Sequence, residues 1–164
     1  MWHIKGNNMN KCIDFVVMGE PVAKQRPRVS TFNGFARAYT PKDTINYENK
    51  VLNCYLDKLK ELNIPKETPY FDRNDLLYVR INIYFTLTKG DYGKKGLNKS
   101  GREKIDNLYC NKHKDIDNLC KSVLDGLNGV AYLDDKQVCI LDSAKMWTTD
   151  SSRVEITIKT INKV

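Results

Sequence analysis

Acidic and basic side chains in the second half of the chain have the types and spacing of a metal-dependent catalytic site. Apolar residues recur at helical spacing over 116–127, which predicts an amphipathic helix. Asp117 and Lys121 are four residues apart, so they share one face of that helix. Asp125 continues the same stripe one turn later, and Asp115 precedes the first turn.

A second acidic pair, Asp134-Asp135, follows the predicted helix. The helix would be about 18 Å long. The chain from Asn128 to Asp135 can span at most about 23 Å when it is extended. If the chain doubles back along the helix, Asp135 reaches the level of Asp117. The spacing therefore permits a cluster of three carboxylates without requiring one.

Such a cluster would suit a hard divalent cation. Neighbouring carboxylates repel each other, and their pKa values rise unless a cation neutralises them. Mg²⁺ and Mn²⁺ prefer oxygen ligands from carboxylate, water and phosphate. These ions activate bound water and stabilise the attacking and leaving oxygens of a phosphodiester. A nearby ammonium group, here Lys121, can offset the charge that develops on the phosphoryl group. The pattern therefore indicates metal-dependent cleavage of nucleic acid.

The composition is that of a soluble globular protein with a basic surface. Of 164 residues, 41% are hydrophobic and 29% are charged, which excludes a disordered chain, a collagen-like repeat and a coiled coil. The net charge of +7 favours polyanionic partners such as nucleic acid. The sequence has no apolar run long enough for a bilayer, no secretory signal and no CxxC pair among its five cysteines. We therefore expect a cytoplasmic protein.

Sequence periodicity predicts a single domain over residues 1–164. The predicted elements are a strand over 12–18, a helix that Thr40-Pro41 opens and that ends near residue 63, a strand over 76–87, the helix 116–127, and strands over 136–147 and 153–162. The order β-α-β-α-β-β predicts an α/β (α+β) fold, with a mixed β-sheet and two main helices packed on it. The connection 88–114 is predicted to be a long basic loop, either a solvated insert or an arm that follows phosphates.

Basic side chains gather before the first predicted helix and again beside the acidic cluster. Lys24, Arg26 and Arg28 lie close together in a segment that two prolines interrupt, and Lys114 immediately precedes Asp115. We expect these four cations to bind the backbone of DNA.

Aromatic residues follow the basic segment. Phe32, Phe35 and Tyr39 alternate with basic residues, an arrangement that suits stacking on unpaired or distorted bases. The alternative is that Phe35 and Tyr39 are core residues of a short strand over 35–39.

Other interpretations compete with a nuclease. Asp115 or Asp117 could be a helix N-cap worth about 1 kcal/mol. Asp117 and Lys121 could form a surface ion pair worth about 0.3–0.5 kcal/mol. The protein would then be a non-catalytic nucleic-acid-binding module. A zinc site could use Cys110, His113 and either Cys120 or His3. That zinc site lacks a second close pair of ligands, and a Ser/His/Asp hydrolase lacks its G-x-S-x-G motif.

The motifs resemble those of one known family over roughly residues 12–162. The most specific part, within 113–138, is Asp115-x-Asp117-Asn118-Leu119-x-Lys121 followed by Asp134-Asp135-x-Gln137-Val138. A basic block matches as well, Gly19-x-Pro21-Val22-x-Lys24-x-Arg26-Pro27-Arg28. This combination resembles the RusA-type endonucleases, small Holliday junction resolvases that are mostly borne by phages or prophages.

The resemblance implies a function and a set of site residues. It implies Mg²⁺ ligands at Asp115, Asp117 and Asp135, a catalytic lysine at Lys121, and a motif position of less clear role at Asp134, an additional candidate ligand. It also implies a homodimer in which each subunit nicks one strand of a four-way junction during DNA recombination and repair. A two-fold protein presents two equivalent sites to a two-fold junction. Cleavage of other branched DNA is an open alternative.

Overall fold

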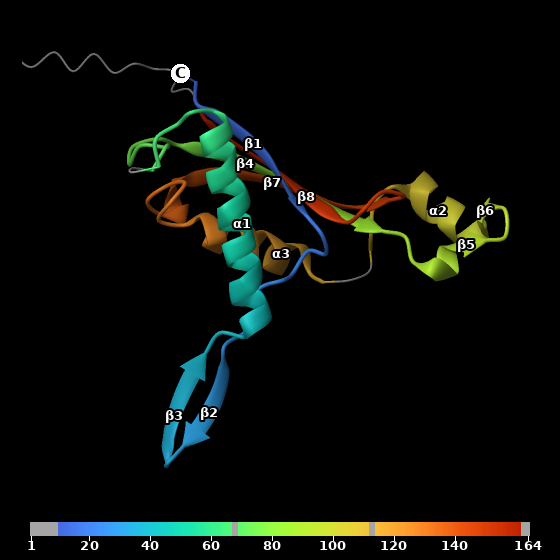
Figure 1. Cartoon of the computed structure of the whole chain (residues 1–164), viewed down its shortest axis with the longest axis horizontal. Helices are drawn as coiled ribbons and strands as arrows, with labels where there is room; N and C mark the ends of the chain where they lie inside the picture. Colours follow the sequence, from blue (N-terminus) through green and yellow to red (C-terminus); the bar gives the residue numbers. More distant parts are fainter. Residues whose placement is uncertain (1–9, 67–68, 112–113, 162–164) are drawn as a thin grey trace, which may run out of the picture.

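A four-stranded mixed sheet forms the centre of the molecule. The computed structural model describes residues 10–66, 69–111 and 114–161 (Figure 1). The strands lie across the sheet in the order β1 (Cys12–Met18), β8 (Arg153–Thr160), β4 (Leu77–Thr86) and β7 (Val138–Thr148). β4 and β7 are parallel, whereas β1–β8 and β8–β4 are antiparallel. The predicted α+β fold with a mixed sheet is confirmed.

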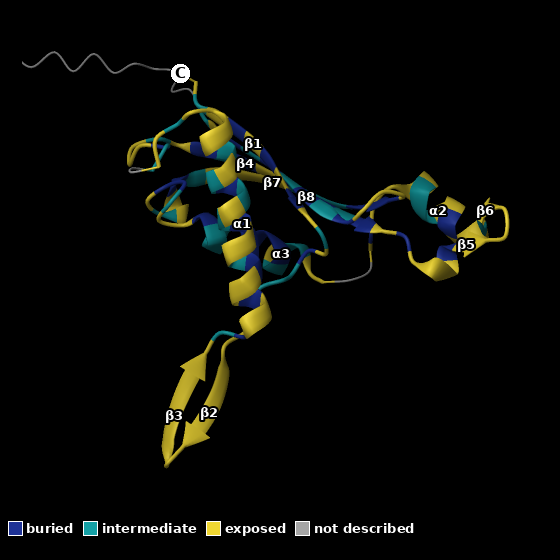
Figure 2. Ribbon diagram, in the orientation of Figure 1, coloured by how far each residue is buried: buried dark blue, intermediate teal, exposed yellow. Residues whose placement is uncertain are grey.

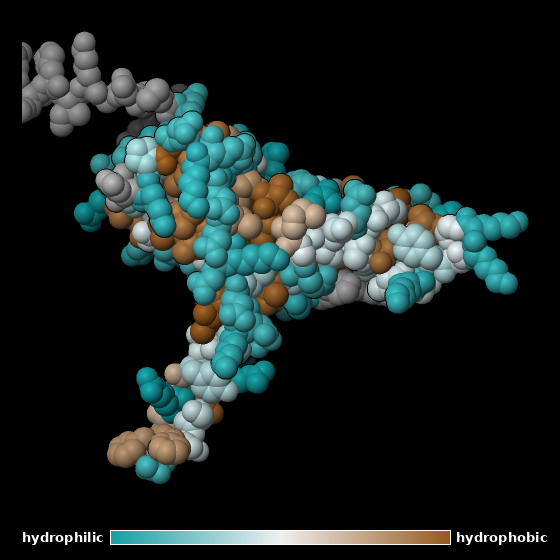
Figure 3. Space-filling view, viewed as in Figure 1, coloured by the Kyte–Doolittle hydropathy of each residue, from teal (hydrophilic) through white to brown (hydrophobic). Residues whose placement is uncertain are grey.

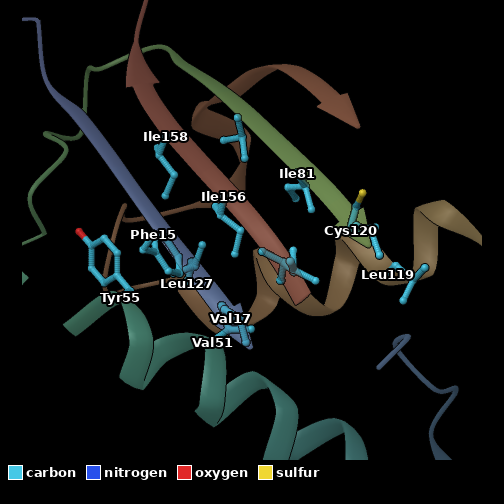
Figure 4. Packing of buried hydrophobic residues seen from close by; sticks show 14 of the residues in the cluster. Phe15, Val17, Val51, Tyr55, Ile81, Leu119, Cys120, Leu127, Ile156 and Ile158 are labelled. Carbon is cyan, nitrogen blue, oxygen red and sulfur yellow. The ribbon is translucent and has the colours of Figure 1, made fainter. Parts of the chain in front are cut away.

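Two helices cover one face of this sheet, as the sequence predicts. α1 (Lys42–Glu61) packs against β1, α3 (Ile116–Leu127) packs against β7, and the two helices contact each other. Alternate strand residues point into the core, including Val17, Ile81 and Ile156, where they meet side chains such as Val51 from α1 (Figure 4). None of the helices in the described ranges is long and apolar enough to cross a membrane.

A hairpin projects from the body of the molecule just before α1 (Figure 1). It consists of β2 (Arg28–Phe32) and β3 (Phe35–Tyr39), so the short strand predicted over 35–39 is present. Asn33 and Gly34 join the strands with φ angles of 50° and 80°, the conformation of a two-residue type I′ turn. All residues of both strands are exposed (Figure 2), so the placement of Phe35 and Tyr39 in the core is wrong.

The connection between β4 and α3 is a folded lobe rather than the long loop that the sequence predicts. The lobe, residues 88–107, contains the 3₁₀ turn η1 (Lys89–Asp91), the short strands β5 (Tyr92–Gly93) and β6 (Gly96–Leu97), and helix α2 (Lys99–Asn107). It lies at one end of the sheet (Figure 1). The prediction is wrong because the lobe is polar and rich in glycine, which is typical of a loop. Its folded structure depends on one buried carboxylate, which the sequence pattern does not reveal.

That carboxylate belongs to Asp91, which is only 2% exposed. It accepts hydrogen bonds from the amide and the hydroxyl of Thr88, both at 2.9 Å, and pairs with the Lys104 ammonium at 2.6 Å. The bond from Lys104 is the largest cause that holds the pKa of Asp91 far below its usual range, against the opposing effect of burial. Gly101 is required beside it, because a Cβ there would lie 2.3 Å from the Asp91 carbonyl oxygen.

We expect the lobe to lose stability in acid. A carboxylate whose pKa is depressed by folding stabilises the folded state above its unfolded pKa of about 3.9, and this contribution is lost as the pH falls below about 5. The Lys104 ammonium lies 4.7 Å from the ring centre of Trp147, so Trp147 fluorescence in a Trp2→Phe background reports on the lobe. Acid titration should change this signal before the whole protein unfolds.

Substitution of Asp91 provides the control for this prediction. Asp91→Asn should loosen the lobe already at neutral pH and remove the acid transition, because an amide cannot neutralise Lys104. Asp106→Asn, which alters an exposed carboxylate of α2, the helix that carries Lys104, should behave like the wild type. An unchanged acid transition in Asp91→Asn would contradict the assignment.

Candidate active site

Helix α3 contributes one face to the core and the opposite face to the candidate site. Its buried residues are Leu119, Cys120, Ser122, Val123 and Leu127. Asp117 and Lys121 are exposed on the other face, and Asp125 is partly buried. The helical spacing thus places the predicted acidic and basic side chains where solvent and substrate reach them.

A cavity of about 380 Å³ brings together residues that are distant in the sequence. Asp117, Lys121 and Asp125 line it from α3, and Asp135 lines it from the segment that precedes β7. Leu141 and Ser143 of β7 complete the wall. The predicted return of the chain along the helix is therefore present, and two of the three predicted metal ligands face the same space as the predicted catalytic lysine.

The two neighbouring aspartates 134 and 135 have different surroundings. Asp134 precedes the 3₁₀ turn η2 (Asp135–Gln137), and its carboxylate accepts a hydrogen bond of 2.9 Å from the Lys136 amide. This backbone bond is the largest cause that lowers the pKa of Asp134. Asp134 lines a separate hollow and is not among the residues that line the cavity with Asp135. The structure thus gives Asp134 a capping role and leaves Asp135 to the cavity.

Gln137 fixes the turn that presents Asp135. Its side-chain amide donates to the carbonyl of Asp72 at 2.7 Å, and its side-chain oxygen accepts from the Leu133 amide at 2.9 Å. Behind the turn, the buried Tyr132 hydroxyl donates to the Leu124 carbonyl at 3.0 Å. Burial raises the pKa of Tyr132, and the nearby charges of Asp135 and Asp125 raise it further.

Asp115 occupies the N-cap position of α3 but does not cap the helix through its side chain. Its carboxylate makes no capping hydrogen bond and is exposed. Asp115 is not among the residues that line the cavity. Among the described residues no ion pair joins Asp117 to Lys121. Neither the capping role of Asp115 nor the surface ion pair is therefore realised.

Two carboxylates of the cavity are of the kind that Mg²⁺ prefers as ligands. Mg²⁺ is usually bound by one or two carboxylates and completes its octahedral shell with water and substrate phosphate. Asp117 and Asp135, which face one cavity, fit this requirement. Within residues 10–66, 69–111 and 114–161, no three His, Cys, Asp or Glu side chains form a ready-made metal cluster.

The zinc alternative finds no support in the same part of the chain. Cys110 and Cys120 are both buried members of the hydrophobic core. His113 and His3, the other suggested ligands, lie outside the described residues.

The basic N-terminal segment is attached to α3 by hydrogen bonds. The Ser122 hydroxyl donates to the Val22 carbonyl at 2.6 Å, and the Lys24 amide donates to the Asn118 carbonyl at 2.8 Å. The Lys114 ammonium donates to the Pro21 carbonyl at 3.0 Å. These bonds place the basic segment beside the helix that carries the candidate site.

Lys24 joins α1 to α3 rather than pointing freely into solvent. Its ammonium lies 2.5 Å from a carboxylate oxygen of Glu48 and 2.8 Å from one of Asp125. Burial of the ammonium opposes its charge, but the two carboxylates together raise the pKa of Lys24. The sequence predicts that Lys24 binds DNA. These two ion pairs give Lys24 a competing role, the positioning of α1 against α3, which the local pattern does not indicate. Arg26 and Arg28 are exposed.

Comparison with known proteins identifies the family of the chain. The family model described as endodeoxyribonuclease RusA matches residues 18–159. This chain belongs to the RusA endodeoxyribonuclease family. It is also 27% identical over 151 residues to the uncharacterised protein YqaN of Bacillus subtilis (strain 168), an alignment that covers 92% of this chain and 98% of YqaN. The resemblance drawn from the motifs is thereby confirmed, as is the general class of endonuclease.

Two positions that support this site, Glu48 and Gly126, are not predicted from the sequence, and the motif residue Gln137 has a structural role that the motif does not reveal. Glu48 and Gln137 act through contacts with residues far along the chain, so no local spacing reveals these contacts. Gly126 does carry a signal, since glycine inside an amphipathic helix often marks close packing. A Cβ at residue 126 would lie 2.8 Å from the Glu48 carbonyl oxygen, so α1 and α3 approach each other there.

We expect Lys24→Met to lower the stability of the folded protein and to have little effect on its affinity for DNA. The substitution leaves the carboxylates of Glu48 and Asp125 close together without their shared cation. Loss of two charge-assisted bonds at a partly buried site should lower the free energy of unfolding by about 1–2 kcal/mol. Urea unfolding measures this effect.

Arg26→Ala is the matched control for Lys24→Met. Arg26 is an exposed cation, so its removal should change stability by less than about 0.5 kcal/mol and weaken DNA binding instead. If Lys24→Met unfolded like the wild type while it lost DNA affinity, the bridging role of Lys24 would be wrong.

Proposed function

We propose that this RusA-family protein is a Mg²⁺-dependent, structure-selective endodeoxyribonuclease that resolves Holliday junctions by paired nicking in DNA recombination and repair. The observation that carries the proposal is the shared cavity of Asp117, Lys121 and Asp135 in a chain of this family. Two carboxylates and one ammonium group around one space suit metal-dependent hydrolysis of a phosphodiester, because the carboxylates can hold the metal and the ammonium can offset charge on the phosphoryl group.

Each residue of the cavity has a distinct proposed role. Asp117 and Asp135 would hold Mg²⁺, which supplies an activated water and polarises the scissile phosphate. Lys121 would orient the phosphate and offset its negative charge. Asp115 would contribute the third carboxylate from the N-terminus of α3, whereas Asp134 would maintain the turn. Asp125 takes no direct part in this scheme, because Lys24 neutralises it.

The substrate proposed is branched DNA, above all a four-way junction. The net charge of +7 favours a polyanion, and the exposed cations Arg26 and Arg28 lie where the chain enters the hairpin. Phosphate contacts hold a strand without reading its sequence, which suits recognition of shape.

The free edge of β7 supports the proposal of a homodimer. One half of that edge is covered, because Tyr109 bridges Met146 and the Cys110 amide donates to the Lys145 carbonyl at 2.9 Å. The other half includes Ile140 and Leu141, which are 48% and 46% exposed. An uncovered apolar edge strand favours pairing with another chain. Because Leu141 also lines the cavity, a second copy bound there would bring two sites close together.

Cleavage assays on defined DNA test the proposed nuclease. Asp117→Asn and Asp135→Asn should each reduce nicking of a labelled four-way junction at least about 100-fold, since each removes a charge from the catalytic cavity. Asp134→Asn is the matched control, since it changes the neighbouring carboxylate and should retain most activity. EDTA should stop the reaction, and Mg²⁺ should restore it.

The DNA products distinguish this proposal from its alternatives. Paired nicks on the junction but not on a matched linear duplex are expected. Equal digestion of the linear duplex would leave a nuclease without junction selectivity. Intact DNA under all conditions, together with retained binding in a gel shift, would favour a non-catalytic binding module.

Ile140→Lys should separate the proposed homodimer into single chains. A lysine on an exposed edge strand opposes pairing because its charge would be buried. Light scattering should give twice the 19.0 kDa chain mass for the wild type and a single chain mass for the variant. Val16→Lys, at an exposed apolar position on β1, is the control and should remain dimeric. A wild-type protein of single mass would contradict the dimer.

A further inference from the structure

The β2–β3 hairpin exposes a large apolar surface for so small an element. Phe32 and Phe35 flank its turn with 79% and 80% of their surface exposed. Figure 3 shows this apolar material gathered at the free end of the hairpin. An isolated two-stranded hairpin is at best marginally stable in water, and exposed aromatic rings gain free energy when they are covered. Contact of a partner with the end of the hairpin would therefore be favourable.

The strand register places the aromatic rings and the cations on one face. Directly paired residues in an antiparallel hairpin point to the same side, and successive pairs alternate between the two sides. The pairs Phe32–Phe35, Ser30–Arg37 and Arg28–Tyr39 therefore share one face. The opposite face carries the smaller pairs Thr31–Ala36 and Val29–Ala38. One side of the hairpin thus combines rings at its end with guanidinium groups behind them.

The charge around the hairpin is of a single sign. The sequence contains no aspartate or glutamate between residues 21 and 42. Arg28 and Arg37 are exposed, and neither forms an ion pair with another described residue. The hairpin itself carries Arg28 and Arg37 without one acid, so it would repel an identical hairpin but attract phosphates. This charge favours DNA over a second copy of the chain.

The base of the hairpin is attached to the helices that carry the site. On one side the chain reaches β2 from Lys24, which is bonded to both α1 and α3. The Gln25 amide also donates to the buried Thr44 hydroxyl of α1 at 3.3 Å. On the other side β3 leads directly into α1. DNA bound by the hairpin is therefore placed relative to the catalytic cavity.

We propose that the aromatic face of this hairpin binds the branch point of the DNA substrate. Phe32 and Phe35 stack on bases that are unpaired or unstacked at the crossover, and Arg28 and Arg37 bind the adjacent phosphates. In a continuous duplex every base is already stacked on its neighbours, so the rings find no surface there. The hairpin would thus determine selectivity for branched DNA, an inference that rests on the proposed function.

Junction binding without cleavage tests the proposal. All proteins carry Asp117→Asn, and the probe is a four-way junction with 2-aminopurine at the crossover. Phe32→Ala/Phe35→Ala should weaken junction binding about 10- to 100-fold, as expected for lost stacking, and change affinity for linear duplex by less than about 3-fold. The change in 2-aminopurine fluorescence on binding should disappear. Phe32→Trp/Phe35→Trp should restore both.

A matched control alters the opposite face of the same hairpin. Val29→Ala/Thr31→Ala should keep the junction preference and the fluorescence change. Equal loss of affinity for junction and duplex in the phenylalanine variant would overturn the proposal, as would an unchanged fluorescence response. A drop in molecular mass in that variant would instead assign the hairpin to contact between copies. These readouts need no cleavage, so the hairpin can fail while the nuclease stands, or the reverse.

Discussion

The structure depends on helix α3, which must bury one side in the core and expose the opposite side to solvent. The apolar side of α3 packs against β7 and α1, and this burial fixes the rotation of the helix about its axis. Asp117 and Lys121 then have no freedom to face elsewhere. The close approach at Gly126 and the ion pairs of Lys24 secure the same helix from the side of α1. The position of these candidate catalytic side chains thus follows from hydrophobic packing.

The parts of the fold that the sequence predicts well are those with regular periodicity. The helix expected over 116–127 is the observed α3 from Ile116 to Leu127, because its apolar positions repeat without interruption. The strands are also found within a few residues of their expected limits, since β-rich apolar segments mark them, most clearly in the alternation of β4. Asp135 reaches the cavity of Asp117 as the chain-length argument permits. Local pattern thus predicts the elements, whereas the limit on reach only permits the meeting of Asp135 and Asp117.

Features that depend on contacts between distant residues could not be predicted in this way. The lobe is ordered by Asp91 and Lys104, whose pairing no periodicity reveals. Lys24 resembles any residue of a basic block, yet its partners lie on two helices. The error for the hairpin is the reverse. The alternation of Phe35 and Tyr39 suggests a buried face, but both residues are exposed because no second layer covers the hairpin in the described part of the chain. Alternation identifies a strand but does not identify what covers it.

The cavity and the two projecting elements, the hairpin and the lobe, occupy separate parts of the molecule. The sheet and its two helices hold the cavity, while the hairpin and the lobe extend from the body in different directions (Figure 1). Their surfaces are largely exposed, in contrast to the buried faces of the sheet (Figure 2). A ligand that contacts both the cavity and a projection must be extended, as DNA is. The architecture therefore favours recognition of a large shape by a small protein.

The position of β8 has a consequence for the newly made chain. β8 is the last strand along the chain, yet it lies between β1 and β4 in the sheet. In the described ranges β1 has no other neighbouring strand, so β1 must wait until β8 has been made before it can join the sheet. Translation proceeds from the N-terminus, and pairing over so long a separation closes slowly. The sheet thus closes only once β8 has left the ribosome, and until then β1 lacks the strand that joins it to β4.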